Sequence, residues 1–547
     1  MDVDLKQMLA TARASLQAGR FEGVEALCRP VLARHPNDLV ALQCAGFAAL
    51  QSGQPDQAVG FLRRAVDAKP GDAGLLTNLG VALKAAGDID AAVAAYRNAL
   101  ERAPGAGETW FSLGNALKEL NAEDESEAAY RRALATGNCR SGGASVYCNL
   151  GTLLHERGRY EAAIDAYRQA IRLSPGNATY RFNLANSLRA NLALDEAIDA
   201  YDDALRLQPD FAVARCNQAL AFLLKGDFAR GFSGYEARLY TAELASRGFN
   251  KPLWRGEPLE GRCLVLHAEQ GFGDAIQFLR YLPLLDARGG RVVVVVFAPL
   301  RRLVEHKIAH DGLGRTEVVD GTAPLPPFDF HLPFMSLPNA VGFDPDAIPG
   351  PPPYLRAEAA AVQHWTERLT SEASTSDGCR RIGLVWAGNP THDNDRNRSI
   401  KPAALWPLLD AVGTRARFFS LQLGAGAAGL ADFPPGAVTD LAPFLHDFAD
   451  TAAAISALDL VICVDTAVAH LAGALGKRVE LLLPYNSDWR WLSGRPDSPW
   501  YPTMRIHRQA SPGDWEGVVA RLATELGDTA GSDDYRSSSE SSAIFMR

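Results

Sequence analysis

Two short turns in the second half of the sequence combine acidic residues with glycine or threonine, a mixture that suits the binding of a polar ligand. The first turn consists of Glu269, Gln270, Gly271, Phe272, Gly273 and Asp274. It directly follows the apolar run Cys263–His267. Its two glycines let the backbone come close to a ligand. Asp274 stands at an expected helix start, so its carboxylate either faces the ligand or simply caps the helix.

The second turn follows another apolar run, Leu460–Val464, and opens a second helix. Its residues of interest are Asp465, Thr466, Ala467 and His470. Free backbone N–H groups at a helix start suit a diphosphate, and the Thr466 hydroxyl adds a donor. His470 follows one helical turn later, either within reach of the same ligand or packed against the sheet. The loop 392–399 brings Arg398 toward the same end, and arginine suits bidentate phosphate contacts.

The elements that must position these turns alternate between strands and helices. The predicted strands are Cys263–His267, Arg291–Phe297, Ile382–Trp386, Phe418–Gln422, Leu460–Val464 and Val479–Leu483. The predicted helices lie near Asp274–Asp286, Ala298–His306, Pro402–Val412, Thr451–Ala457 and Thr466–Leu475. Such alternation predicts parallel sheets with helices on both faces. Ligands of these sheets bind beyond the carboxyl ends of the strands, where both turns stand.

The sequence before residue 246 follows a different rule, a period of 34 residues with one spacing of 37. A small residue recurs at Gly46, Gly80, Gly114, Gly151 and Ala185, and a bulky one at Leu62, Tyr96, Tyr130, Tyr167 and Tyr201. Alanines follow three residues after each bulky position, and prolines end most second helices. The pattern resembles tetratricopeptide repeats, in about seven units, which implies an α-solenoid superhelix.

Stacked repeats of this kind leave a long groove, so we expect a protein or peptide to bind there. The alternative is that the repeats join two copies of the chain into a homodimer. Asparagines recur in the first helices of the units, at Asn78, Asn115, Asn149 and Asn183. They are candidates for hydrogen bonds to a bound peptide backbone, or are simply solvated.

These patterns divide the chain into predicted segments. They are a repeat domain (1–245), a Gly- and Pro-containing linker (246–260), two Rossmann-like subdomains (261–360 and 380–526) and a polar, Ser-rich, disordered tail (527–547).

Composition narrows the function further. The net charge of -9 argues against a general nucleic-acid binder, which needs a basic field. The sequence contains no apolar run long enough for a transmembrane helix, and its first residues do not resemble a signal peptide. The eight cysteines form no CxxC pair and are expected to be reduced, as in a cytoplasmic protein.

Three longer stretches carry a further family resemblance. They are HAEQGFGDAIQFLRYLPLL, RIGLVWAGNPTHDNDRNRSI and LDLVICVDTAVAHLAGALGKRVELLLPYNSDWRWL. Together they resemble glycosyltransferase family nine, the ADP-heptose:lipopolysaccharide heptosyltransferases, as attached to repeats in some bacterial proteins. The resemblance implies a GT-B fold, with the acceptor on the first subdomain and a nucleotide-sugar on the second.

The resemblance also implies roles for individual residues. Asp274 matches the general base, with Gln270, Gly271 and Gly273 in the acceptor-side loop. The residues that match the donor site are Asp465, Thr466, Ala467, His470 and Arg398, although the family often has lysine at the last position. The expected reaction inverts the sugar carbon and needs no protein-bound metal or cofactor beyond the nucleotide-sugar. Asp393-Asn394-Asp395 has the DxD form of metal-dependent glycosyltransferases, but the neighbouring arginines supply charge without a metal.

The sequence therefore predicts a glycosyltransferase that acts on a protein acceptor, such as flagellin, recruited by the repeats. Two alternatives stay open. One is an inactive scaffold for protein–protein interaction, and the other is a heptosyltransferase-like enzyme whose acceptor is a glycan.

Overall fold

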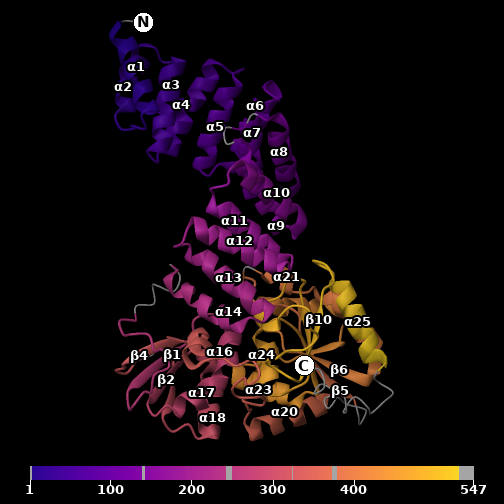
Figure 1. Cartoon of the computed structure of the whole chain (residues 1–547). Coiled ribbons are helices and arrows are strands. Elements are labelled where there is room, and N and C mark those ends of the chain that lie inside the picture. The colour runs from indigo at the N-terminus through magenta and orange to yellow at the C-terminus, as the bar shows by residue number, and fades with distance from the viewer. Residues whose placement is uncertain are drawn as a thin grey trace. The chain divides into compact units, whose positions relative to one another are not determined.

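The computed structural model describes residues 3–137, 139, 142–241, 249–322, 324–372, 379–392 and 394–528. The chain divides into two compact units, Met1–Pro209 and Asp210–Arg547 (Figure 1). Three predicted features fall wholly or partly outside the described residues. They are the tail from 529 onward, residues 246–248 of the linker, and Asp393 of the DxD-like stretch.

The first unit is built, over its described residues, from helices that pair in sequence order. They are α1 (Val3–Gln17), α2 (Val24–Arg34), α3 (Leu39–Gln51), α4 (Pro55–Ala68), α5 (Ala73–Ala85), α6 (Ile89–Arg102), α7 (Gly107–Glu119), α8 (Glu123–Thr136), α9 (Ala144–Glu156), α10 (Tyr160–Leu173), α11 (Ala178–Ala190) and α12 (Leu194–Leu207). Several of these helices have an N-cap residue whose side chain accepts a hydrogen bond from the first turn. Asp38, Asp72 and Asn177 accept hydrogen bonds from backbone N–H groups of the following turn at 2.9–3.2 Å.

The small and bulky residues of the 34-residue period pack against each other inside each helix pair. A Cβ atom added to Gly80 would lie 2.5 Å from the Tyr96 ring, and one added to Gly114 would lie 2.6 Å from the Tyr130 ring. Both tyrosines are almost completely buried. At Gly80 and Gly114 the absence of a side chain is therefore a steric requirement, because a Cβ atom would overlap the tyrosine ring.

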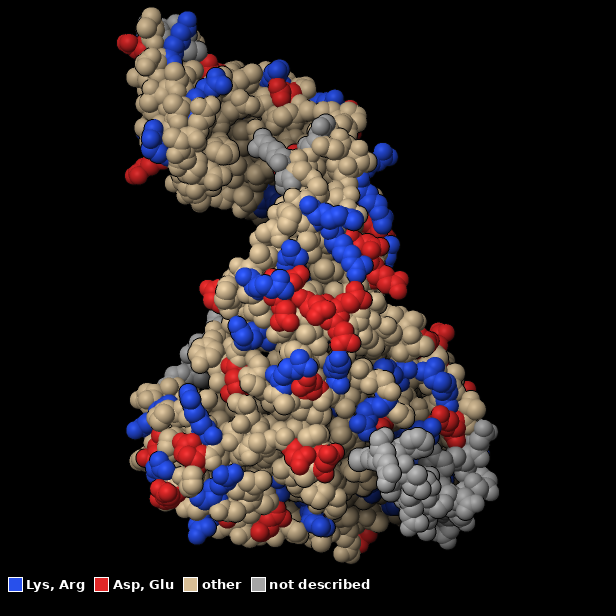
Figure 2. All heavy atoms as spheres, in the orientation of Figure 1, with Lys and Arg blue, Asp and Glu red and all other residues tan. Residues whose placement is uncertain are grey.

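Charged side chains of opposite sign also pair between neighbouring repeats. Lys118 Nζ lies 2.8 Å from Glu156 Oε1, and Arg168 Nη2 lies 3.0 Å from Glu196 Oε2. Figure 2 shows acidic and basic side chains intermixed on the surface. Exposed pairs of this kind contribute only about 0–1 kcal/mol each, so the stability of the repeats depends mainly on their buried apolar packing.

The second unit begins with α13 (Ala212–Lys225), α14 (Phe228–Tyr235) and the 3-10 helix η1 (Glu236–Tyr240), the seventh predicted repeat. Its aromatic side chains pack on both sheets of this unit. The ring centroids of Phe228 and Phe343 are 4.8 Å apart, and those of Phe232 and Trp489 are 5.7 Å apart. Phe343 follows the first sheet and Trp489 follows a strand of the second. The seventh repeat is therefore a structural part of the α/β unit.

The first sheet is parallel, with the strand order β3-β2-β1-β4. Its strands are β1 (Cys263–His267), β2 (Arg291–Val296), β3 (Thr316–Asp320) and β4 (Phe330–Pro333). Its helical elements are α16 (Phe272–Phe278), η2 (Leu279–Tyr281), α17 (Leu282–Asp286), η3 (Ala298–Leu300), α18 (Arg301–Asp311), η4 (Phe334–Ser336) and α19 (Leu337–Val341). The steps from β1 to β2 to β3 run in one direction, so right-handed crossovers place α16–α17 and α18 on one face.

The opposite face of the first sheet differs from the prediction of helices on both sides. It carries Cys263, Val265 and Val293, and the side chains packed on it include Phe249 and Phe328, which lie in irregular segments. The reason is that the return from β3 to β4 is a short loop with no helix.

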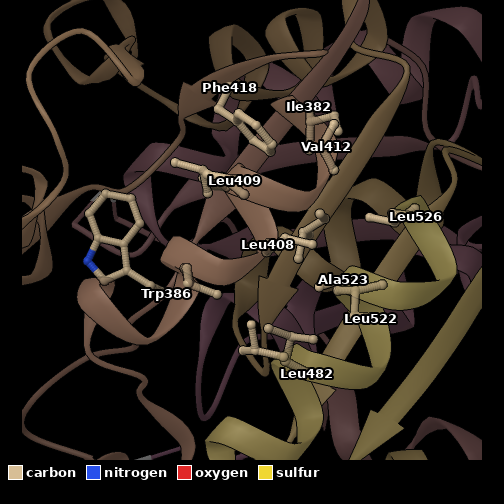
Figure 3. Packing of buried hydrophobic residues seen from close by; sticks show 14 of the residues in the cluster. Ile382, Trp386, Leu408, Leu409, Val412, Phe418, Leu482, Leu522, Ala523 and Leu526 are labelled. Atoms are coloured by element: carbon tan, nitrogen blue, oxygen red, sulfur yellow. The ribbon is translucent and has the colours of Figure 1, made fainter. Parts of the chain in front are cut away.

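The second sheet is also parallel, with the order β10-β9-β8-β5-β6-β7. Its strands are β5 (Arg380–Val385), β6 (Ala416–Ser420), β7 (Val438–Asp440), β8 (Leu460–Val464), β9 (Val479–Leu483) and β10 (Met504–Arg508). The main helices around it are α20 (Ala359–Glu372), α21 (Asp395–Arg398), α22 (Trp406–Val412), α23 (Phe448–Ala457), α24 (Ala467–Ala474) and α25 (Trp515–Asp528). In chain order this is the 3-2-1-4-5-6 arrangement of doubly wound sheets. Figure 3 shows α22 and α25 packed on one face through Leu408, Leu409, Leu522 and Leu526.

The predicted strand positions agree with the structure where the apolar run is continuous. β1, β8 and β9 begin and end as predicted, whereas β3, β4, β7 and β10 were not predicted. Charged residues such as Arg505 interrupt the pattern of β10, and β7 has only three residues. The predicted helix 274–286 is correct in place but begins two residues earlier and is interrupted by η2.

Replacing Gly114 by alanine is expected to destabilise the repeats by about 1–3 kcal/mol, because the new Cβ overlaps the buried Tyr130 ring. Gly60, in α4, is the matched control, since a Cβ there meets nothing within 4 Å. Gly60→Ala should stabilise by about 1 kcal/mol through helix propensity. The midpoint of urea unfolding, followed by circular dichroism, measures both changes. Equal midpoints for Gly114→Ala and wild type would contradict the steric role of this glycine.

Candidate functional site

The strand order of the second sheet reverses between β5 and β8, which are direct neighbours. Val385, at the end of β5, is paired with Cys463, next to the end of β8. The turns that follow the two strands therefore leave the sheet side by side. In open parallel sheets this reversal point is where ligands bind. The turn after β5 is held in place by Gln422, whose Oε1 accepts hydrogen bonds from the N–H groups of Trp386 and Ala387 at 3.0 and 2.9 Å.

Arg398 lies over the turn after β5. A Cβ atom added to Gly388 would lie 2.6 Å from Arg398 Nη2, so the absence of a side chain at Gly388 makes room for the guanidinium. Arg398 is 14% exposed and its Nε lies 3.3 Å from Asp395 Oδ1. The predicted phosphate-binding arginine thus stands at the reversal point, next to the turn that carries Asp465.

Asp465 and Thr466 occupy the turn after β8. Burial and, to a smaller extent, the charge of Asp488 raise the pKa of Asp465 to about 6, although Trp491 and the charges of Arg398 and Arg490 act in the opposite direction. Thr466 is the N-cap residue of α24, but its side chain makes no capping hydrogen bond, and its Oγ1 is buried without a partner. In the first helical turn the Ala469 N–H donates to the Thr466 carbonyl oxygen at 3.0 Å, whereas the N–H groups of Ala467 and Val468 have no intrahelical acceptor. The Thr466 hydroxyl and the N–H groups at the start of α24 are therefore available to donate hydrogen bonds to a ligand.

His470 lies deeper than the other predicted donor-site residues. It is buried, its Nδ1 is 2.9 Å from the Tyr501 hydroxyl, and its ring stacks on Trp491 with the centroids 5.0 Å apart. Burial lowers the pKa of His470 well below its usual range, so the ring is neutral. A Cβ added to Gly273 would lie 2.7 Å from its Cδ2, which means that His470 faces the turn of the first sheet.

The turn after β1 carries Asp274 in the third position of α16. The N-cap residue is Gly271, so Asp274 stands three positions inside the helix and not at the N-cap position itself. Asp274 nevertheless caps the helix, because its Oδ2 accepts the Gly271 N–H at 2.8 Å. Its Oδ1 lies 2.5 Å from Arg490 Nη2, and the carboxylate is 17% exposed.

Arg490 is the central residue that sequence reasoning missed. It lies in the 3-10 helix η9 (Trp489–Trp491) with only 7% of its side chain exposed. Besides Asp274, its guanidinium binds Asp488 Oδ1 at 2.8 Å and Gln277 Oε1 at 2.7 Å. Since Arg490 also acts electrostatically on Asp465, the two predicted turns meet around this one cation. The aromatic residues Trp491, Trp500 and Tyr501 of the same region are fully buried.

The other residues of the first turn contact the seventh repeat. Gln270 Nε2 donates to the Tyr235 hydroxyl at 2.9 Å. Glu269, which the sequence did not single out, forms a bidentate ion pair with Arg238, with distances of 3.0 and 2.9 Å. Both partners are buried. Gln270 is thus engaged by the protein.

The asparagines of the repeats bond largely to their neighbours. Asn115 Oδ1 accepts hydrogen bonds from the Tyr130 hydroxyl and from Asn149 Nδ2, each at 2.8 Å. Asn183 Nδ2 lies 3.6 Å from the Cys148 sulfur. These amides connect successive first helices, a role that neither interpretation from sequence included.

Two kinds of feature are absent from the described residues. No group of three or more His, Cys, Asp or Glu side chains there is arranged to hold a metal ion. None of the helices in the described part of the chain is long and apolar enough to cross a membrane.

Comparison with known proteins identifies the repeats. Tetratricopeptide-repeat family models match residues 49–95, 77–142, 151–191 and 182–246. The last match includes α13 and α14, which the contacts assign to the α/β unit. Repeats of this type indicate protein–protein interaction.

The chain is also similar to protein FlbA of Caulobacter vibrioides, with 29% identity over 340 residues, 58% of this chain and 55% of FlbA. It thus spans about half the length of that curated relative. Because 58% of 547 residues is more than the repeats occupy, the similarity reaches into the α/β unit. Among solved structures, the chain resembles YrrB, described as a TPR protein with an unusual peptide-binding site (21% identity, TM-score 0.30, 33% of this chain and 91% of YrrB). It also resembles PilF of Pseudomonas aeruginosa (19% identity, TM-score 0.34, 39% and 93% of the two chains).

The raised pKa of Asp465 predicts a measurable effect on stability. The folded state holds this proton more tightly than the unfolded state does, so the contribution of Asp465 to stability falls as the pH rises from 3.8 through about 6. Asp465→Asn should remove this pH-dependent loss of stability. Above pH 6 the variant should therefore be more stable than the wild type by roughly 1–3 kcal/mol. Thermal unfolding across this pH range measures the effect. Asp410→Asn, at an exposed position of α22, is the control and should follow the wild type. A variant at Asp465 that keeps the wild-type pH dependence would contradict the assignment.

Proposed function

We propose that the protein is a glycosyltransferase with a GT-B-type arrangement, which binds a nucleotide-sugar at the reversal point of the second sheet. One observation carries the proposal. Arg398, Asp465 and the unpartnered Thr466 hydroxyl gather at that point, and the carboxylate of Asp274 reaches the same cluster through Arg490.

The donor diphosphate would lie at the N-terminus of α24. The free N–H groups there and the Thr466 hydroxyl donate hydrogen bonds, and Arg398 supplies positive charge without a metal ion. Asp465, with a pKa of about 6, is partly protonated near neutral pH and can both donate to and accept from sugar hydroxyls. His470 would have a structural role beneath the site, since its ring packs against Trp491 and its Nδ1 is within hydrogen-bond distance of the Tyr501 hydroxyl.

The reaction would be a single displacement with inversion. The acceptor hydroxyl oxygen bonds to the anomeric carbon, the bond from that carbon to the phosphate oxygen breaks, and the nucleoside diphosphate leaves with the electron pair. The hydroxyl proton passes to Asp274. Both carboxylate oxygens of Asp274 already accept hydrogen bonds, so proton transfer accompanies advanced bond formation. Arg398 and the α24 N-terminus stabilise the departing diphosphate.

The acceptor would be a protein, such as flagellin, held by the repeats. The tetratricopeptide repeats support this choice because they are protein-binding modules. All eight cysteines are unpaired, which supports a reducing compartment such as the cytoplasm. The competing functions are an inactive scaffold and an enzyme whose acceptor is a glycan, with the repeats used for assembly.

The donor site predicts that the protein binds a free nucleoside diphosphate. UDP, GDP and ADP, tested separately by thermal unfolding of the full chain, should include at least one that raises the midpoint. Arg398→Met should weaken its binding about tenfold or more, through the loss of a charge-assisted contact.

Arg396 gives a matched control, because it lies on the same short helix but is exposed. Arg396→Met should leave the nucleotide affinity unchanged within about twofold. If none of the three nucleotides binds, or if both arginine variants lose affinity equally, the proposed donor site is wrong.

The catalytic assignment is tested with Asp274→Asn, which keeps oxygen and size but removes the basic group. Transfer should fall by about 10²–10⁴-fold, with nucleotide affinity unchanged within about threefold. Wild type and variant are co-expressed with the proteins that the full chain captures, and mass spectrometry then seeks a sugar mass on those proteins.

The outcomes separate the three functions. A mass shift that depends on Asp274 supports the protein glycosyltransferase. Captured proteins without any such shift favour the scaffold, and donor consumption that is dependent on Asp274 but leaves these proteins unmodified favours the glycan acceptor. Full transfer by Asp274→Asn would remove Asp274 as the base.

A further inference from the structure

We infer that Arg238 of the seventh repeat is a positioning residue for Asp274. The side chain of Arg238 is 4% exposed and that of Glu269 is not exposed at all. Arg238 Nε and Nη2 donate to the two oxygens of Glu269 at 3.0 and 2.9 Å. This bidentate geometry fixes the orientation of both groups, because the guanidinium and the carboxylate are planar.

Glu269 is held from a second side as well. Its Oε1 accepts the backbone N–H of Met335, in the 3-10 helix after β4, at 3.0 Å. Arg238 Nη2 in turn donates to the Ser336 hydroxyl at 2.8 Å. The Glu269 carboxylate therefore connects η1 with the turns after β1 and β4, two strands that are neighbours in the first sheet.

The short distance along the chain makes this anchor relevant to Asp274. Glu269 lies two residues before Gly271, the N-cap residue of α16, and Asp274 bonds to the Gly271 N–H. The intervening Gln270 is also held by the repeat, through the Tyr235 hydroxyl. Both side chains of the segment 269–270 are thus bound by the seventh repeat immediately before the helix that carries the carboxylate.

Other contacts of Asp274 do not substitute for this anchor. Arg490 holds the carboxylate itself from the second sheet, but the backbone path into α16 contains two glycines, which restrict the chain little. The Arg238–Glu269 pair supplies that restriction. A consequence is that the repeat array ends in a residue pair that controls the proposed base, so the seventh repeat is part of the catalytic unit. This inference rests on the proposed function only for its effect on turnover.

The test uses the full chain with Arg238→Lys, which keeps the positive charge but loses the planar fork. Hydrogen exchange measured by mass spectrometry should be at least tenfold faster in the peptide 268–278 and unchanged in residues 460–475. With whichever nucleotide-sugar the wild type consumes, kcat should fall at least tenfold while the donor KM stays within twofold. Arg230→Lys, in an exposed pair with Asp227 on α14, is the matched control and should change neither quantity.

A second variant distinguishes a local effect on the turn from a general destabilisation of the protein. Arg238→Met with Glu269→Gln removes both fully buried charges, and the only carboxylate that loses its ion-pair partner is that of Glu236, which is 20% exposed. It should keep the wild-type unfolding midpoint within a few degrees and still show the faster exchange and lower kcat. Unchanged exchange in 268–278, or unchanged turnover per folded molecule, would overturn the positioning role. If the wild type consumes no donor, the proposed function fails, and the exchange measurement alone decides whether Arg238 holds the turn.

Discussion

The burial of one cation, the guanidinium of Arg490, constrains the whole candidate site. A buried charge is stable only if counter-charges and hydrogen bonds replace the water it has lost, and removing one partner of such a group typically costs about 3–5 kcal/mol. The Arg490 guanidinium donates hydrogen bonds to Asp488 in its own segment and to Asp274 and Gln277 in the helix after β1. The turn of the first sheet is therefore held against the second sheet by an electrostatic requirement, and Asp274 and Asp465 come to share one neighbourhood.

Glycine residues, which have no side chain, make this close approach possible. Gly273 lies against the ring of His470, and Gly388 lies beneath the guanidinium of Arg398. At both positions a Cβ atom would overlap the neighbouring side chain, so an alanine would push a site residue out of place. The same principle operates in the repeats, where Gly80 and Gly114 admit tyrosine rings. At these four positions glycine acts by the space that it leaves.

Sequence and packing assign the seventh repeat to different parts of the protein. By sequence it belongs to the tetratricopeptide repeats, since a family model covers residues 182–246. By packing it belongs to the α/β unit, because the rings of Phe228 and Phe232 contact Phe343 and Trp489, and Arg238 binds Glu269 in the turn after β1. A fragment that ended at residue 245 would expose these aromatic rings.

The sequence by itself determined the features that depend on local pattern. The 34-residue period fixed the helix pairs, and the uninterrupted apolar runs fixed β1, β8 and β9 and hence the turns that carry Asp274, Asp465 and Thr466. Only the tertiary structure decided the reversal of strand order between β5 and β8, the loop-covered face of the first sheet, and the pairing of Arg490 and Arg238 with carboxylates far away in the sequence. The physical reason is that periodicity reports which face of an element avoids water. The partner of a buried charge is chosen by three-dimensional proximity between distant segments, and one sequence carries no local signal for that choice.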